Sequence, residues 1–162
     1  MNLKQIKDYP NYSFDLNTNQ VYSHYSKIYL KPRLNNRYYE IRLYKNSKRK
    51  DIRLHRLVYE AYNGEIPTGY VIDHIDLNTH NNHITNLRLA TISQNSCNQK
   101  VNKNNKSTGY KNIFLTKNNT YRVKIKKNNK VVYCKNFKTL EEAIINRDIQ
   151  MKLNHEEFCN LG

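Results

Sequence analysis

The sequence lacks several residue types and patterns, and each absence excludes a class of protein. Tryptophan is missing and only 38% of the residues are hydrophobic, so the cores must be small and built on Ile, Leu, Val and the 14 tyrosines. The three cysteines, Cys97, Cys134 and Cys159, are isolated, which argues against a disulfide framework or a cysteine metal site. No apolar run reaches transmembrane length, and residues 1–10 lack the apolar stretch of a signal peptide. We therefore expect a cytoplasmic protein with no membrane partner.

Acidic residues are scarce, and the resulting excess of positive charge indicates what kind of molecule the protein binds. The chain of 162 residues has 28 Lys and Arg against 13 Asp and Glu, a formal net charge of +15. Between Leu77 and Leu140 there is no acidic residue, while thirteen Lys and Arg are spread along the stretch. Such a balance points to a polyanion, and we expect double-stranded DNA.

The segment Tyr70–Asn98 is the candidate active site. Two short apolar runs flank a polar loop rich in Asn and His, which is typical of a hairpin whose long turn carries function. Thr91 and Gln94 have the spacing of a capping box, so we expect a short helix to begin there and to carry Asn95.

Four polar residues of this segment carry a family resemblance. Asp73 and His74 precede the loop, Asn86 opens the second apolar run, and Asn95 lies on the expected helix. The pattern resembles the ββα-metal fold of HNH nucleases, most closely the phage-type HNH homing endonucleases. The resemblance implies that Asp73 and Asn95 hold one divalent metal ion. It also implies that His74 is the general base and that Asn86 orients its imidazole.

The chemistry of these side chains agrees with that assignment. Phosphodiester hydrolysis needs a base to deprotonate water and a cation to take up developing charge. A histidine with a pKa of about 6.5 is mostly neutral at pH 7, and an amide oxygen can fix its tautomer. One carboxylate and one amide oxygen suit Mg²⁺, or Mn²⁺ in its place. Because adjacent residues of a regular strand face opposite sides, Asp73 and His74 must lie at a strand end or an irregularity.

Other interpretations of the segment stay open. The polar residues could be turn and cap residues around a structural histidine. A zinc site could use His74, His80 and His83, although their spacing does not match the usual pairs of zinc ligands. The roles of His55, His80 and His83 are left undecided, and a structural role for His55 on a packing helix is the simpler interpretation.

Residues 1–52 are interpreted as a β-rich accessory module. Alternating and β-branched runs predict strands near residues 12–14, 21–24 and 37–44, followed by a basic turn at 45–50. The segment resembles the small module that often precedes phage HNH domains, through Tyr9-Pro-Asn-Tyr12 and Leu43-Tyr-Lys45 among its landmarks. The predicted phosphate contacts are Lys48, Arg49, Lys50 and Arg53. The alternative is a solvated charged hairpin.

Residues 53–98 form the predicted nuclease core, and residues 99–108 the predicted basic linker. The core opens with an amphipathic helix over 54–62, which Asn63-Gly64 should end and whose apolar face should pack on the hairpin. The linker is rich in Asn and Lys and has no apolar core of its own. It is either a strap that lies along DNA or a disordered tether.

Residues 109–162 are predicted to be a DNA-binding module. Three strands joined by Asn-rich turns should precede a helix that begins at a capping box, Thr139 to Glu142. The middle strand, residues 120–126, alternates between apolar and basic side chains, so one face should be apolar and the other cationic. The module resembles the Apetala-type DNA-binding domain of plant transcription factors, which is also appended to many phage HNH endonucleases, through Gly109–Ile113, Tyr121–Val123 and Glu141–Ala143 among its landmarks. In that family the sheet enters the major groove. The candidate DNA contacts are Arg122, Lys124, Lys126 and Lys111, and the alternative is a solvated charged face.

Together these features predict an α+β protein of small modules and a site-specific DNA endonuclease of the HNH homing type. We expect it to act as a monomer with one metal ion per active site, and to be phage-encoded and active in a bacterial host. Two alternatives remain: a non-catalytic DNA-binding regulator on an HNH scaffold, and a non-specific HNH nuclease.

Overall fold

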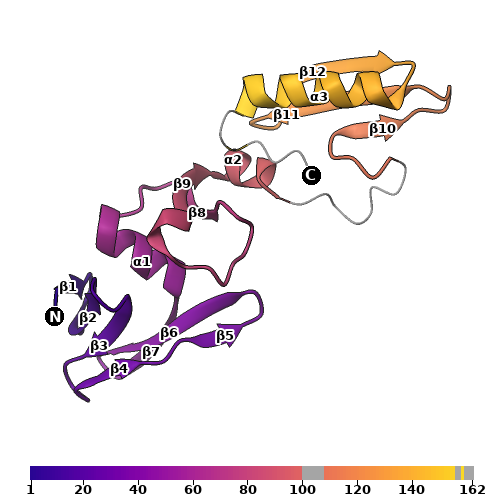
Figure 1. The fold of residues 1–162 in the computed structure, drawn as a ribbon. Helices are drawn as coiled ribbons and strands as arrows, with labels where there is room; N and C mark the ends of the chain where they lie inside the picture. The colour runs from indigo at the N-terminus through magenta and orange to yellow at the C-terminus, as the bar shows by residue number, and fades with distance from the viewer. Residues whose placement is uncertain (100–107, 156–157, 159–162) are drawn as a thin grey trace. The chain divides into compact units, whose positions relative to one another are not determined.

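A computed structural model describes residues 1–99, 108–155 and 158, so most of the predicted linker lies outside the described residues. The chain divides into two compact units, Met1–Leu89 and Ala90–Gly162 (Figure 1). Each unit combines antiparallel strands with one or more helices, which confirms the predicted α+β class. Among the described residues, no helix is both long and apolar enough to span a membrane.

The first unit begins with a four-stranded antiparallel sheet in the order β1-β2-β3-β4. Its strands are β1 (Leu3–Ile6), β2 (Tyr9–Asp15), β3 (Gln20–Ser23) and β4 (Ile28–Leu30). The sequence pattern predicted parts of β2 and β3. Asp8, Asn19 and Lys27 lie between these strands with positive φ, a backbone region that Asn and Asp tolerate better than most residues.

A second sheet, β5-β6-β7, follows it. Its strands are β5 (Arg33–Asn35), β6 (Tyr38–Lys45) and β7 (Lys48–Arg53). The predicted basic turn over 45–50 was too long, because the turn is confined to Asn46 and Ser47, whose φ angles are 49° and 61°. Lys48 pairs with Lys45 in the ladder, and farther along the same strands Ile52 pairs with the buried Ile41.

A helix and a hairpin complete this unit. The helix α1 (Leu54–Asn63) ends at Gly64, whose φ of 88° suits glycine and whose N–H donates to the Glu60 carbonyl at 3.0 Å. This confirms the predicted helix end. The strands β8 (Tyr70–His74) and β9 (Leu87–Thr91) pair as a two-stranded sheet, with the short 3₁₀ helix η1 (Ile84–Asn86) before β9.

One hydrophobic core joins most of these elements of the first unit, and β5 contributes no residue to it. Phe14 of β2, Leu43 of β6, Leu57 of α1, Ile72 of β8 and Leu87 of β9 belong to the same buried cluster. The predicted packing of α1 on the hairpin is therefore present, and the N-terminal strands share that core. The predicted module boundaries, which came from motifs, stay predictions.

The second unit contains two helices and a sheet. The helix α2 (Ile92–Cys97) begins at the predicted capping box, in which the Thr91 side chain accepts from the Gln94 N–H at 3.2 Å and the Gln94 side chain accepts from the Thr91 N–H at 2.8 Å. The three predicted strands form one antiparallel sheet: β10 (Ile113–Leu115), β11 (Tyr121–Lys127) and β12 (Lys130–Phe137).

The last helix packs on this sheet and closes the second core. The helix α3 (Leu140–His155) begins at the predicted Thr139–Glu142 capping box and runs along the sheet (Figure 1). The core consists of Ile113, Val123, Ile125, Ala143 and Met151. The alternation predicted for β11 is confirmed, since Val123 and Ile125 are buried and the alternate Arg122, Lys124 and Lys126 are exposed.

Candidate active site

Asp73 and His74 end the strand β8, and both are buried, with exposed fractions of 3% and 5%. This placement agrees with the expectation that Asp73 and His74 lie at a strand end. The strand ends at His74, so the backbone there no longer obliges neighbouring side chains to alternate between two faces. The chain then enters the polar loop that the sequence singled out.

His74 forms a hydrogen bond with an unexpected residue. His74 Nε2 lies 3.1 Å from the side-chain oxygen of Asn82. An amide oxygen only accepts, so Nε2 carries the proton and the basic lone pair of the neutral ring is on Nδ1. Asn86 was predicted for this role, but its side chain is engaged elsewhere. Asn82 belongs to the polar loop rich in Asn and His that the sequence singled out.

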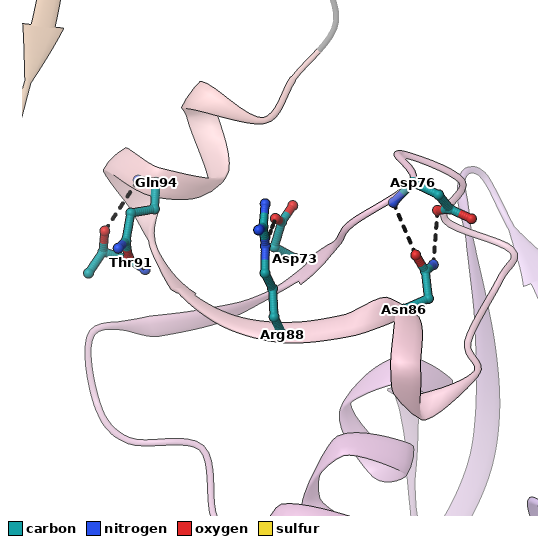
Figure 2. Close-up of polar contacts among 6 residues, drawn as sticks. All are labelled: Asp73, Asp76, Asn86, Arg88, Thr91 and Gln94. Atoms are coloured by element: carbon teal, nitrogen blue, oxygen red, sulfur yellow. Dashed lines mark hydrogen bonds and ion pairs between the residues drawn. The ribbon is translucent and has the colours of Figure 1, made fainter. Parts of the chain in front are cut away.

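Asn86 instead holds the loop together (Figure 2). Its oxygen accepts from the Asp76 N–H at 3.0 Å, and its Nδ2 donates to Asp76 Oδ1 at 2.9 Å and to the Asn81 carbonyl at 2.8 Å. Partial burial raises the pKa of Asp76, but hydrogen bonds from Asn81, the Asn78 N–H and Asn86 outweigh it, so the pKa lies below its ordinary value. Asn86 therefore braces the loop that carries Asn82.

Asp73 forms a buried ion pair that sequence reasoning missed. Arg88 Nε donates to Asp73 Oδ2 at 2.9 Å, and the two side chains are only 14% and 4% exposed (Figure 2). Arg88 lies on β9, which pairs with the strand of Asp73. The sequence did contain a signal for this pair, because Arg88 is the one charged residue in the apolar run Leu87–Ala90. A charge on a half-buried strand requires a partner of opposite charge.

The remaining histidines of the region have different surroundings. The ring of His80 lies 5.3 Å from that of Tyr39, and His83 Nδ1 lies 2.8 Å from Thr85 Oγ1. His55, on α1, packs against His74 with 5.1 Å between ring centroids. Within the described part of the chain, no three His, Cys, Asp or Glu side chains gather as a metal site, so the zinc alternative gains no support.

The comparison with known families bears on these residues. Residues 53–97 match the family described as HNH endonuclease. This segment is similar to an HNH endonuclease domain. It contains the buried Asp73-His74 pair, the loop braced by Asn86 and the beginning of α2.

Two phage proteins are similar to stretches of this chain that are longer than residues 53–97. The chain is 39% identical over 100 residues to DNA endonuclease I-HmuI of Bacillus phage SP01, covering 61% of this chain and 58% of that protein. It is 51% identical over 65 residues to protein 3.8 of Escherichia phage T7, covering 40% of this chain and 53% of that protein. The matches thus span little more than half the length of these relatives.

A solved structure is similar over nearly the whole chain. It is described as DNA binding and cleavage by the HNH homing endonuclease I-HmuI, and it covers 96% of this chain and 92% of its own. The sequence identity is 27% and the TM-score is 0.57. The fold and the HNH domain therefore have a solved counterpart, while neither the Apetala-type module nor the accessory module is tested by it.

The other predicted metal ligand, Asn95, lies half-buried on α2 in the second unit. Neighbours within that unit hold this helix. Ser93 Oγ accepts from the Asn128 N–H at 3.1 Å, and Cys97 Sγ lies 3.1 Å from His155 Nδ1.

Lys111 donates to the Ser96, Cys97 and Gln99 carbonyls at the end of the helix. Lys111, predicted to contact DNA, therefore acts in the structure as a helix cap.

The other predicted DNA contacts lie on sheet surfaces. Arg122, Lys124 and Lys126 are exposed on β11, and Arg122 Nε donates to Asn136 Oδ1 at 3.0 Å. Lys48, Arg49 and Lys50 are exposed on β7. Arg53 is also exposed, and its guanidinium lies 4.6 Å from the centroid of the Tyr38 ring. The contacts of these residues with DNA stay a prediction.

Replacing Arg88 with glutamine should destabilise the first unit by about 3 kcal/mol, because it leaves the buried Asp73 carboxylate without its guanidinium. Urea unfolding would measure the loss. The control is Arg42→Gln, which removes the 2.9 Å pair with the more exposed Asp51 and should cost at most about 1 kcal/mol. Equal effects of the two variants would mean that the Arg88 pair contributes no more than a surface one.

Proposed function

We propose that this protein is a site-specific, metal-dependent DNA endonuclease of the HNH homing type. The observation that carries the proposal is the buried Asp73-His74 pair at the end of β8, within a segment that matches the HNH endonuclease family. Buried polar side chains destabilise a fold unless they are compensated. Phosphodiester hydrolysis needs a base that deprotonates water and a carboxylate that can bind a metal ion, and His74 and Asp73 would supply these two groups.

In this proposal His74 is the general base. Asn82 accepts from Nε2–H, so Nδ1 can take a proton from the attacking water. Asn86 supports this arrangement indirectly, because it ties the loop that carries Asn82 to Asp76. The predicted catalytic contribution of Asn86 is thereby reassigned from orienting His74 to bracing the loop.

Asp73 and Asn95 are the proposed metal ligands. One carboxylate and one amide oxygen are hard donors that suit Mg²⁺ or Mn²⁺. The ion would neutralise charge that develops on the phosphate and on the leaving oxygen. The contact with Arg88 fixes the orientation of Asp73 on its strand, and the capping box and Lys111 fix the helix that carries Asn95.

The DNA partner is proposed from the charge of the chain. The excess of 28 basic over 13 acidic residues favours a long phosphate footprint, in which Arg122, Lys124 and Lys126 face DNA from the exposed side of β11. We propose that the protein acts as a monomer and makes a nick, since the chain has one HNH domain. Two relatives are phage proteins, which favours a phage-encoded enzyme acting in the cytoplasm of a bacterial host.

The test is incubation of supercoiled DNA from an A·T-rich phage library with the protein and Mg²⁺, in parallel with EDTA. Discrete metal-dependent nicks are expected, and Asp73→Asn should abolish them, because it removes the ligand charge while keeping an oxygen for Arg88. The control is Asp8→Asn, a carboxylate on an exposed turn of the first unit.

Two outcomes would favour the alternatives. Tight sequence-selective binding without any cutting would favour the non-catalytic regulator. A smear of fragments in place of discrete ones would favour a non-specific HNH nuclease. Cutting that persists in EDTA would contradict the proposed metal dependence.

A further inference from the structure

Three aromatic rings from three elements of the first unit meet at His74. Tyr38 comes from β6, His55 from α1 and His74 from the end of β8. The ring centroids lie 5.1 Å apart for Tyr38 and His55, 5.1 Å for His55 and His74, and 6.2 Å for Tyr38 and His74. Arg53 stacks on Tyr38. Packing thus brings together residues that are far apart in sequence.

His55 lies in a buried environment in which its Nδ1 atom makes no hydrogen bond to a described residue. The side chain is only 4% exposed, and its Nδ1 is buried with no hydrogen-bond partner among the described residues. Burial, then the neighbouring His74 and the nearby Arg53 and Arg56, lowers the pKa of His55 to about 3. The ring is therefore neutral at neutral pH. A buried nitrogen without a hydrogen-bond partner destabilises the fold. We therefore attribute the role of His55 to the contacts of its ring with Tyr38 and His74.

We propose that His55, supported by Tyr38, is a positioning residue that holds the imidazole of His74 in the orientation needed for proton abstraction. This inference rests on the proposed function. The planes of the two imidazoles meet at 82°, an edge-to-face contact that rotation of the His74 ring would break. The hydrogen bond to Asn82 fixes one atom of His74, and the packed rings fix its plane.

Both constraints matter because a general base must point its lone pair at the attacking water. Misplacement by about 1 Å lowers a rate by as much as about a hundredfold. The contacts with His55 and Tyr38 restrict rotation of the His74 ring about its Nε2 hydrogen bond. Removal of the His55 ring should therefore slow the chemical step and leave DNA binding unchanged, because His55 is buried and packs against His74.

The experiment compares His55→Ala with His55→Phe. At saturating DNA and Mg²⁺, well below the melting temperature of each variant, His55→Ala should lower kcat for nicking by about tenfold to a hundredfold with unchanged KM. His55→Phe keeps a ring and should retain most of the wild-type kcat. Tyr38→Ala and Tyr38→Phe repeat the comparison from β6, which keeps the test available if His55→Ala does not fold.

The controls separate this inference from the proposed function. His24→Ala removes an exposed histidine of the first unit, hydrogen-bonded to Ser13 at 2.8 Å, and should leave kcat unchanged. Wild-type kcat in folded His55→Ala would overturn the inference, as would equal loss in folded His55→Ala and His55→Phe. If the wild-type protein itself does not nick DNA, the proposed function fails before the variants are compared.

Discussion

Replacing His74 with alanine should lower the rate of DNA cleavage by about two to four orders of magnitude while DNA affinity stays nearly the same. The rate falls because no other histidine takes over the proton: His55 is neutral but packed against His74, and His80 and His83 lie on the loop with other contacts. Single-turnover nicking at saturating protein would measure the rate, and a filter-binding titration in Ca²⁺ the affinity.

The binding measurement distinguishes a catalytic from a structural His74. The side chain is buried, so it contributes little surface to DNA. A large loss of affinity in His74→Ala would mean that the residue maintains the fold, and the assignment as general base would be wrong. His24→Ala, in the same assays, shows how much an unrelated histidine substitution changes either quantity.

Replacing Arg122, Lys124 and Lys126 together with glutamine should weaken DNA binding strongly at low salt. The three side chains are exposed on β11 while the alternate residues Val123 and Ile125 are fully buried, so the fold should tolerate the change. If each contacts a phosphate, the slope of log affinity against log salt concentration should fall by about 3. Fluorescence anisotropy at several salt concentrations would measure it.

The matched control removes the same charge elsewhere. Lys4, Lys27 and Lys31 are exposed in the first unit and are not among the predicted contacts. Their replacement by glutamine should change the slope much less. Equal slopes for the two triple variants would mean that the net charge alone determines affinity, and the assignment of β11 as the DNA-binding strand would fail. A flat salt response of the wild-type protein would contradict the long basic footprint itself.

Short sequence patterns predicted those parts of the fold that depend on interactions between residues close together in the chain. The alternation of β11, the apolar face of α1 with its glycine end, and the capping box of α2 are each encoded within about ten residues. The end of β8 at His74 followed from elementary strand geometry. For the candidate site, the same local patterns located Asp73, His74 and Asn95 on the expected elements.

Contacts between distant segments were not predictable in this way. Arg88 follows Asp73 by fifteen positions, and only the pairing of β8 with β9 makes them neighbours. Tyr38 reaches His74 from another sheet, and Asn82 replaces Asn86 because the loop folds around Asp76. Several strands, β1 and β7 among them, depend on partners that a single segment does not reveal.

The anchoring of α2 has a consequence for the order in which the protein is synthesised. His74 and the residues around it lie in the N-terminal unit, which leaves the ribosome first and can fold first. The helix that carries Asn95 contacts residues that are synthesised later, since Cys97 contacts His155, which follows it by 58 residues. If Asn95 is a metal ligand, a nascent or truncated chain has its base but no anchored second ligand. Under the proposed function, the metal site would therefore be complete only after the C-terminal unit has been synthesised.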